Sequence, residues 1–163
     1  ETVSNFDENK LINNMEKIKT FNFQGTTKCP GLIHKEIWER VGGWSEEFSP
    51  TGGDDTDFAM KLWKIDVRIF KGLGKCLVFH FGSVVTRRNN DNIKIKTESG
   101  NKGNKIFLLK WGITIKFFKR FYLKSDIPYT SVLTEPKKDI NYLFCLILCK
   151  INYLYVKYIY KLK

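Results

Sequence analysis

Apolar and polar positions along the first half of the chain alternate between helical and extended patterns. Residues 33–41 place three aliphatic side chains on one helical stripe, and the two glycines that follow are typical of a helix end. Residues 55–64 repeat apolar side chains at the same spacing. Residues 67–81 contain two short β-type runs around the sequence KGLG, which we expect to form the turn between two strands. The pattern predicts an α/β fold in which the two helices pack on these short strands.

The second half of the chain has a mostly helical pattern. The polar stretch 87–104 is expected to be a loop, and the apolar segment after it predicts a helix that ends at Gly112. Thr114 is expected to cap a second helix, so that the two helices form a hairpin or a corner. The chain is therefore expected to have three zones, over residues 1–86, 87–136 and 137–163.

The last zone, 137–163, is rich in aromatic residues and has lysines at regular intervals. Lys150, Lys157 and Lys161 would fall within roughly 40° of one another on a helix. The longest uncharged stretch, 140–149, is too short to span a bilayer. We therefore expect either an amphipathic helix that lies in a membrane interface or a helix packed across the domain.

The positive charge of the chain is concentrated in its second half. Residues 1–86 contain 11 Lys and Arg against 12 Asp and Glu, whereas residues 87–163 contain 17 against 5. This asymmetry predicts that the second half meets an anionic partner, which would be phospholipid, a phosphorylated substrate or nucleic acid. The alternative explanation is a genome bias that raises the content of Lys, Asn and Ile.

The cysteine pattern favours a reducing, cytoplasmic compartment. The four cysteines form no CxxC pair, and Cys145 and Cys149 lie one helical turn apart in an apolar run, where a thiol behaves as a small hydrophobe. Peripheral attachment to a membrane through the last zone is compatible with this location. The first residues do not resemble a signal peptide, and a start without Met is expected of a fragment or a processed piece.

The acidic sequence GGDDTDF, residues 52–58, is the stretch most indicative of chemistry. Three carboxylates in four positions are more than a helix start needs, and adjacent like charges repel each other. A cation, a network of sugar hydroxyls or a proton transfer would make use of them. A solvated acidic helix start is the alternative, and a calcium loop is disfavoured because the later ligands of an EF-hand pattern are missing.

Two further residues are candidates for a binding site. His80 ends an apolar strand, where it either faces a ligand or metal or is a half-buried histidine held by a hydrogen bond. Trp44 follows two glycines and precedes two acids, so it would either stack on a sugar ring or pack into the core.

These pieces follow one another as IHKEIWERVGGWSEEFSP, GGDDTDFAMKLW, VRIFKGLGKCLVFHFGS and TRR. This order resembles the C-terminal half of the family 2 glycosyltransferases, which are inverting nucleotide-sugar enzymes with the GT-A fold. Residues 106–136 are similar to a tail in one branch of such enzymes, so the resemblance covers about residues 20–136. It implies the C-terminal part of a GT-A fold, of the α/β class, with an added helical C-terminal tail.

The resemblance implies roles for the acidic cluster and the loop before it. Asp54 and Asp55 match the paired acids of the family, and Asp55 would be the general base that takes the proton from the acceptor hydroxyl. Trp44 and Glu46 match the acceptor-side loop. Asp57 would either help to position the acceptor or fix the helix start.

The resemblance also implies where the donor and metal would bind. His80 matches a residue that approaches the metal or the diphosphate, and Gln24 and Gly25 fall near a segment that lines the donor site. The first half of the family, with its D-x-D metal motif, has no counterpart before Glu1. The main ligands of Mg²⁺ or Mn²⁺ are therefore expected in that missing N-terminal half. The chain is accordingly expected to be a fragment, one half of a split gene or a decayed copy.

Three functions from different classes are compatible with these features. The first is a portion of an inverting glycosyltransferase that moves a sugar from a nucleotide-sugar donor to a glycan or lipid-linked acceptor. The second, a non-catalytic basic module for nucleic acid or anionic membrane, leaves the acidic cluster unexplained. The third, a metal-dependent hydrolase that uses Asp54, Asp55, Asp57 and His80, lacks further His or Asp ligands at usable spacing. The first explains most, makes nucleic acid an unexpected partner, and predicts that Asp55 and His80 face one cleft with Trp44 at its rim.

Overall fold

The computed structural model describes residues 5–17, 21–27, 30–49, 52–76, 78 and 102–158. Helices account for about 57% of them, and the sheet that they contain has two strands. The helices are α1 (Glu8–Asn14), α2 (Lys35–Val41), α3 (Asp54–Lys64), an unlabelled helix over 102–111, α5 (Ile115–Phe117) and α6 (Ile140–Tyr158). The strands are β1 (Phe23–Gln24) and β2 (Lys71–Gly72), and short helical turns are η2 (Met15–Lys17), η3 (Glu46–Phe48) and the π-helical η4 (Phe118–Leu123).

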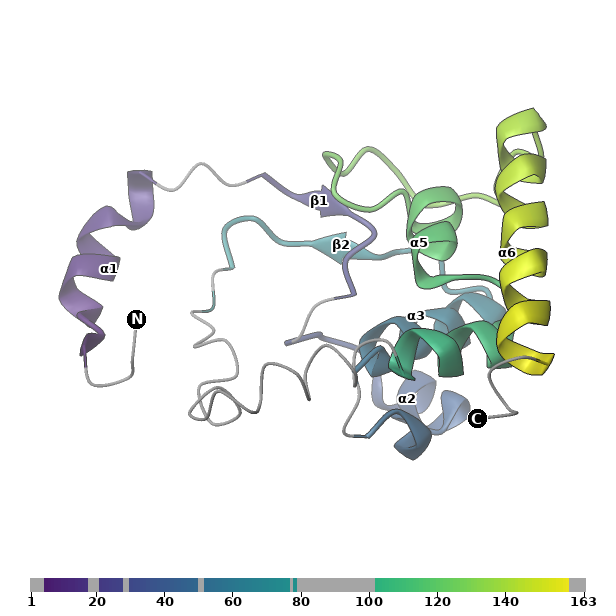
Figure 1. The fold of residues 1–163 in the computed structure, drawn as a ribbon. Helices are drawn as coiled ribbons and strands as arrows, with labels where there is room; N and C mark the ends of the chain where they lie inside the picture. Colours follow the sequence, from purple (N-terminus) through teal and green to yellow (C-terminus); the bar gives the residue numbers. More distant parts are fainter. Residues whose placement is uncertain are drawn as a thin grey trace.

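The elements are spread between two ends of the molecule. In Figure 1, α1 lies at one end and α6 forms the opposite edge, with β1 and β2 between them. Helices α2 and α3 lie beside the helix over 102–111, and an ion pair between Lys110 and Asp57 joins that helix to α3. The α5–η4 segment lies between the strands and α6.

The β-structure departs from the predicted hairpin around KGLG. Phe23 pairs with Gly72, and Gln24 pairs with Lys71, in an antiparallel ladder. Lys71 and Gly72 therefore belong to a strand, so their assignment to a turn was wrong, and the turn comes at 74–75. A Cβ atom at position 72 would collide with the ring of Phe23, which explains the glycine by close strand packing. The remainder of the second predicted strand, at 77 and 79–81, lies outside the described residues.

The helix end at Gly42 and the helix cap at Thr114 are both found at the predicted residues. Gly42 ends α2 in the left-handed conformation, with φ at 71°. The Thr114 hydroxyl accepts a hydrogen bond from the backbone N–H of Phe117 at 3.1 Å, which confirms the predicted cap. The helix 55–64 is confirmed as α3, whereas α2 begins at Lys35, two residues later than predicted. The helix before Gly112 begins at 102, so it takes up the last part of the expected loop.

Aromatic side chains dominate the core. The ring of Trp63 on α3 contacts Phe70, Phe118 and Tyr122 at centroid distances of 6.4, 6.3 and 5.3 Å. These contacts join α3 to the segment before β2 and to η4. The fully buried large side chains of the described residues include Phe48, Phe107, Phe118 and Leu123.

Helix α6 packs one face against this core. Tyr142, Cys149 and Val156, each seven residues apart, are buried, and the Tyr142 hydroxyl lies 3.2 Å from that of Tyr122. Burial, together with this hydrogen bond, raises the pKa of Tyr122. The helix runs on past the uncharged stretch 140–149 to Tyr158, and its 19 residues are long and apolar enough to cross a membrane. The expectation that this segment is too short to span therefore no longer holds for the helix as a whole.

Candidate functional site

An open hollow lies at the start of α3, where the α2–α3 loop turns back. Its volume is about 540 Å³. Three of the residues expected to act on the acceptor side or in catalysis, Trp44, Glu46 and Asp54, line it together. The remaining lining residues are Ser45, Phe48, Ser49 and Gly52.

Trp44 is partly packed and partly exposed. Its ring centroid lies 4.7 Å from that of Phe58 and 5.8 Å from that of Trp38, and 39% of the residue remains accessible. Packing against α2 and α3 holds the indole in place, and its accessible part lines the hollow. Packing of the indole into the core is thus observed, and stacking of its accessible part on a sugar ring stays a prediction.

The three carboxylates of the acidic cluster lie in different environments. Asp54 and Asp55 occupy the first turn of α3 and are half-buried, whereas Asp57 is completely buried. The first turn of an 11-residue helix favours negative charge, which helps α3 to tolerate the adjacent acids. Of the two half-buried carboxylates, Asp54 lines the hollow, whereas Asp55 is not among its lining residues. An approach of Asp55 to an acceptor in the hollow therefore stays a prediction.

Asp57 is held by side chains from three segments. Ser45 donates to Oδ2 at 2.6 Å, and the indole N–H of Trp111 donates to Oδ1 at 2.7 Å. The ammonium of Lys110 lies 3.0 Å from Oδ1, and that of Lys61 lies 4.0 Å from Oδ2. Of the two predicted roles for Asp57, the observed contacts favour fixing the start of α3, because its carboxylate is enclosed by the protein.

Lys110 connects the two sides of this network. Its ammonium also lies 2.7 Å from Oε1 of Glu47, in the loop that forms the hollow. Burial lowers the pKa of Lys110, but hydrogen bonds to Glu47 and Asp57 and their charges outweigh burial, so the pKa is raised above its ordinary 10.5. The loop, α3 and the helix over 102–111 are therefore joined by charge as well as by packing.

The network contains residues that the sequence pattern did not single out. Ser45, Lys110 and Trp111 had been assigned only to a loop and to an apolar helix. Lys110 and Trp111 lie 53 and 54 positions from Asp57 in the sequence. A pattern with helical or strand period reports on near neighbours, so it carries no signal for this pairing.

Gln24 and Gly25, expected near the donor site, lie in and just after β1 and do not line the hollow. The Gln24 side chain is 1% exposed, and neither of its amide atoms has a hydrogen-bond partner among the described residues. Gly25 is buried with φ at 69°, and a Cβ atom there would collide with the carbonyl oxygen of Leu123. Both positions therefore pack against the turn that follows η4.

His80 lies outside the described residues, so its approach to Asp55 stays a prediction. Among the described residues, no three His, Cys, Asp or Glu side chains are grouped so that they could hold a metal ion. The main ligands of Mg²⁺ or Mn²⁺ were predicted for the missing N-terminal half, so that prediction is not tested by this part of the chain.

Comparison with known proteins does not extend the resemblance. No protein-family model, curated protein or solved structure matches the chain. The likeness to family 2 glycosyltransferases therefore depends on the ordered sequence motifs alone.

Proposed function

We propose that the chain is the acceptor-side part of an inverting glycosyltransferase that moves a sugar from a nucleotide-sugar donor to a glycan or lipid-linked acceptor. The observation that carries this proposal is the hollow at the start of α3, which joins Trp44, Glu46 and Asp54. An aromatic ring beside carboxylates suits a sugar, whose C–H face packs on the ring while its hydroxyls donate hydrogen bonds to the acids.

In the proposed transfer of the sugar, each of these side chains has one role. Trp44 stacks on the acceptor sugar, and Glu46 accepts a hydrogen bond from one of its hydroxyls. Asp55 takes the proton from the reacting hydroxyl as that oxygen attacks the anomeric carbon from the face opposite the leaving group. The bond to the nucleoside diphosphate breaks, and the configuration inverts. Asp54 lies next to the base at the same helix start.

The proposal is tested first by acceptor binding. Saturation-transfer NMR of the chain with a panel of short oligosaccharides should show contacts that Trp44→Ala removes and that Glu46→Gln weakens. Glu36→Gln is the matched control, because Glu36 is 86% exposed on α2 and does not line the hollow. Loss of binding in the control as well, or no binding of any oligosaccharide, would contradict the proposed acceptor site.

Catalysis is tested in the longest natural chain that contains these residues. Transfer from nucleotide sugars should be measured with Mg²⁺ or Mn²⁺ present. Asp55→Asn should lower the rate by about 10²-fold or more, because it removes the base, and should leave acceptor binding unchanged. Equal rates for Asp55→Asn and the parent protein would exclude Asp55 as the base.

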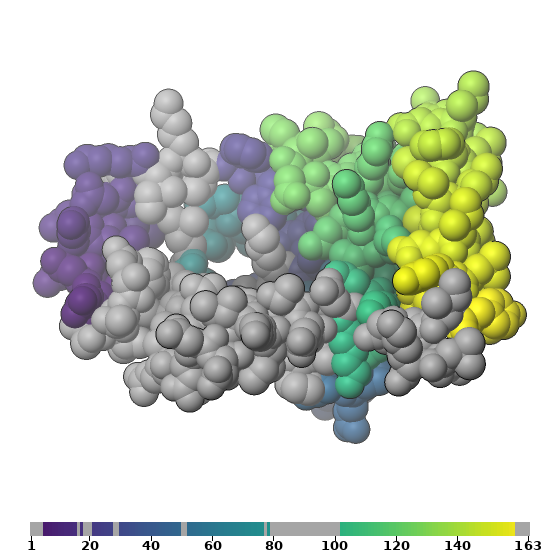
Figure 2. Space-filling model, viewed as in Figure 1, coloured from purple at the N-terminus to yellow at the C-terminus, as the bar shows by residue number. Residues whose placement is uncertain are grey.

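We also propose that α6 lies in the plane of an anionic membrane surface. Its outward face carries nine large apolar or aromatic side chains, each between 48% and 87% exposed. Figure 2 shows α6 as a continuous strip along the edge of the molecule. The nine residues are Ile140, Leu143, Phe144, Ile147, Leu148, Ile151, Leu154, Tyr155 and Tyr158.

The position of the lysines favours an in-plane helix over a spanning one. At about 100° per residue, the nine side chains cover an arc opposite the buried face, and Lys150 and Lys157 lie along one border of that arc. Lysines at this border can reach the headgroups while the arc is buried among acyl chains. A spanning helix would instead place Lys150 near the middle of the bilayer.

Deletion of α6 would remove Tyr142 and Cys149 from the core. The membrane proposal is therefore tested by substitutions on the exposed face of the helix. Ile147→Glu with Ile151→Glu should weaken binding to phosphatidylglycerol vesicles by about tenfold or more, since both apolar side chains leave the lipid. Thr134→Glu with Asn141→Glu is the matched control, because both residues are exposed and lie outside the arc and outside the two hollows, and the variant adds the same charge. Equal weakening in both variants would show that charge alone governs binding and would contradict burial of the arc.

A further inference from the structure

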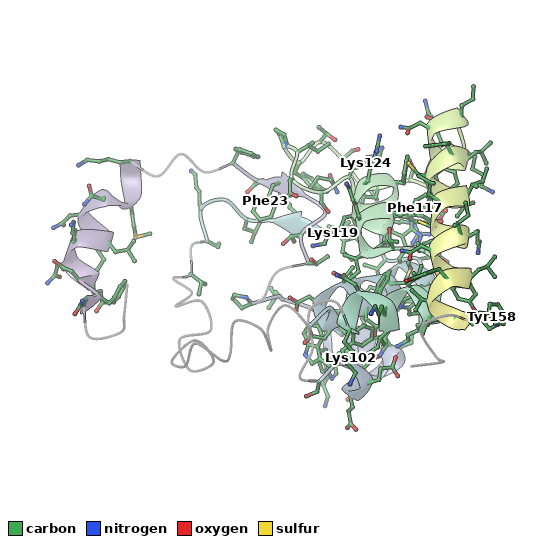
Figure 3. The ribbon with its side chains drawn as sticks, viewed as in Figure 1. Phe23, Lys102, Phe117, Lys119, Lys124 and Tyr158 are labelled. Atoms are coloured by element: carbon green, nitrogen blue, oxygen red, sulfur yellow. The ribbon has the colours of Figure 1, made fainter. Side chains whose placement is uncertain are left out.

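A second, larger hollow of about 1080 Å³ lies between the helix over 102–111, the α5–η4 segment, the turn at 124–127 and the last part of α6. Its lining is strongly basic, with one acidic residue, Asp126, in it. Figure 3 shows two of the basic residues, Lys119 and Lys124, on the same side of the α5–η4 segment. The five basic lining residues are Lys105, Lys116, Lys119, Arg120 and Lys124.

Most of this positive charge is not neutralised within the described part of the chain. Lys116, Lys119 and Lys124 form no salt bridge with any described carboxylate. The guanidinium of Arg120 lies over the ring of Phe121, at 5.1 Å from its centroid. Several like charges around one hollow repel each other and produce a strong positive potential there. A bound anion would relieve that repulsion.

The turn that presents Lys124 is fixed by β1. Lys124 and Asp126 both have positive φ, at 47° and 70°, which is uncommon for residues other than glycine. The backbone N–H of Gln24 donates to the carbonyl of Ile127 at 2.8 Å, and the Ser125 hydroxyl donates to the carbonyl of Gly25 at 2.9 Å. An unfavourable backbone conformation that its surroundings enforce is typical of functional sites.

The hollow also has an apolar wall. Leu108, Ile115, Ile127 and Val156 line it beside the basic residues, and Tyr155 adds an aromatic ring. An inorganic anion alone would leave these side chains unused. The combination suits an anion that carries an organic group.

We propose that this hollow binds a phosphate- or diphosphate-bearing molecule through Lys116, Lys119, Arg120 and Lys124, with the organic part against the apolar wall. Lysine ammonium and arginine guanidinium groups are the side chains that bind phosphate oxygens most strongly. They neutralise the phosphate directly, so a divalent cation is not needed. The ligand is either a soluble phosphate ester or the headgroup of a lipid. The assignment does not depend on the proposed transferase activity, because it uses none of the residues at the start of α3.

The position of α6 makes a lipid headgroup a reasonable source. Asn152 and Tyr155 line the hollow, and Tyr155 also belongs to the exposed apolar arc of α6. A membrane in contact with that arc would bring its phosphates to the border of the hollow. The soluble source therefore needs a separate arm in the experiment.

The test is calorimetric titration of the full chain in EDTA with inorganic pyrophosphate, uridine diphosphate and monomeric short-chain phosphatidic acid. Lys119→Gln with Lys124→Gln should weaken saturable binding of the best probe by about tenfold or more, and rising salt should weaken binding to the parent chain. Lys102→Gln with Lys137→Gln is the matched control, since both lysines are exposed, both lie outside the hollow, and the variant loses the same charge. Circular dichroism of both variants checks that they remain folded.

Each outcome bears on the site. Loss in the Lys119–Lys124 variant alone supports it, and the tighter probe then identifies whether the source is soluble or lipid. Equal loss in the control variant would mean that only diffuse charge attracts the probes, which overturns the proposal. Absence of saturable binding, or stronger binding of a short single-stranded oligonucleotide than of any small phosphate, would also overturn it.

Discussion

Replacement of Asp57 offers the most direct test of how the start of α3 is held. Asp57→Ala would leave the indole N–H of Trp111, the hydroxyl of Ser45 and the ammonium of Lys110 without their common acceptor. The carboxylate is fully buried, and the side chain of Lys110 is 27% exposed. The loss of stability therefore comes mainly from the lost hydrogen bonds and from the Lys110 ammonium, which keeps Glu47 but loses Asp57 as a partner.

The size of the effect follows from these contacts. Removal of one member of a buried ion pair costs about 3–5 kcal/mol. Lys110 can regain some water because it is partly exposed, and it keeps Glu47 at 2.7 Å. We therefore expect Asp57→Ala to lower the free energy of unfolding by about 3 kcal/mol. Asp57→Asn keeps one acceptor oxygen, and we expect it to lose about half as much.

The assay is urea unfolding followed by tryptophan fluorescence and far-UV circular dichroism, with the two probes required to agree. Glu39→Ala is the control, because Glu39 forms a salt bridge of 3.6 Å with Lys35 on the exposed surface of α2. We expect that variant to change the free energy of unfolding by less than about 0.5 kcal/mol. A double-mutant cycle of Asp57→Asn with Lys110→Met then isolates the pair.

The pH dependence provides a second check on the same pair. Because the pKa of Lys110 is raised in the folded chain, its contribution to stability is complete below pH 10.5 and is lost as the pH rises through the raised value. Lys110→Met should remove that part of the alkaline decline. A loss below about 1 kcal/mol for Asp57→Ala, or a coupling energy near zero, would refute the reasoning that this network holds the loop to α3.

Three further predictions concern other parts of the molecule. Gln24→Met should raise the free energy of unfolding in urea by about 1 kcal/mol, because it removes two buried amide atoms without described partners; a lower free energy of unfolding would show that the amide is satisfied. Gly25→Ala should destabilise more than Gly52→Ala, since both glycines have positive φ but only at Gly25 would a Cβ meet the backbone of Leu123; equal midpoints would contradict this. Tyr122→Phe should reduce the loss of stability above pH 10, because the raised pKa of Tyr122 makes the folded chain hold its phenolic proton more tightly, and an unchanged pH profile would be inconsistent with that pKa.

The acidic cluster illustrates how far a motif can be interpreted. The sequence predicts that Asp54, Asp55 and Asp57 start a helix, and α3 begins at Asp54. It does not predict that Asp57 turns inward while the other two stay half-buried. The distinction depends on Ser45 and on Trp111, which reach Asp57 from other segments of the fold.

Local chemistry accounts for what the sequence determines by itself. Gly42 ends α2, Thr114 caps α5, and the apolar period of 55–64 yields α3, because caps and periodicity act over one or two helical turns. These features need no knowledge of the remainder of the chain. They would favour the same elements in any fold that buries the same faces.

The tertiary structure decides which distant segments meet. It pairs Lys71 and Gly72 with β1 instead of folding them into a turn, and it joins Lys110 to Asp57 across 53 positions. It also gathers basic residues from 105 to 124 around one hollow and leaves one face of α6 exposed. Such contacts depend on shape and charge matched across the whole fold, and short-range patterns in the sequence do not encode them.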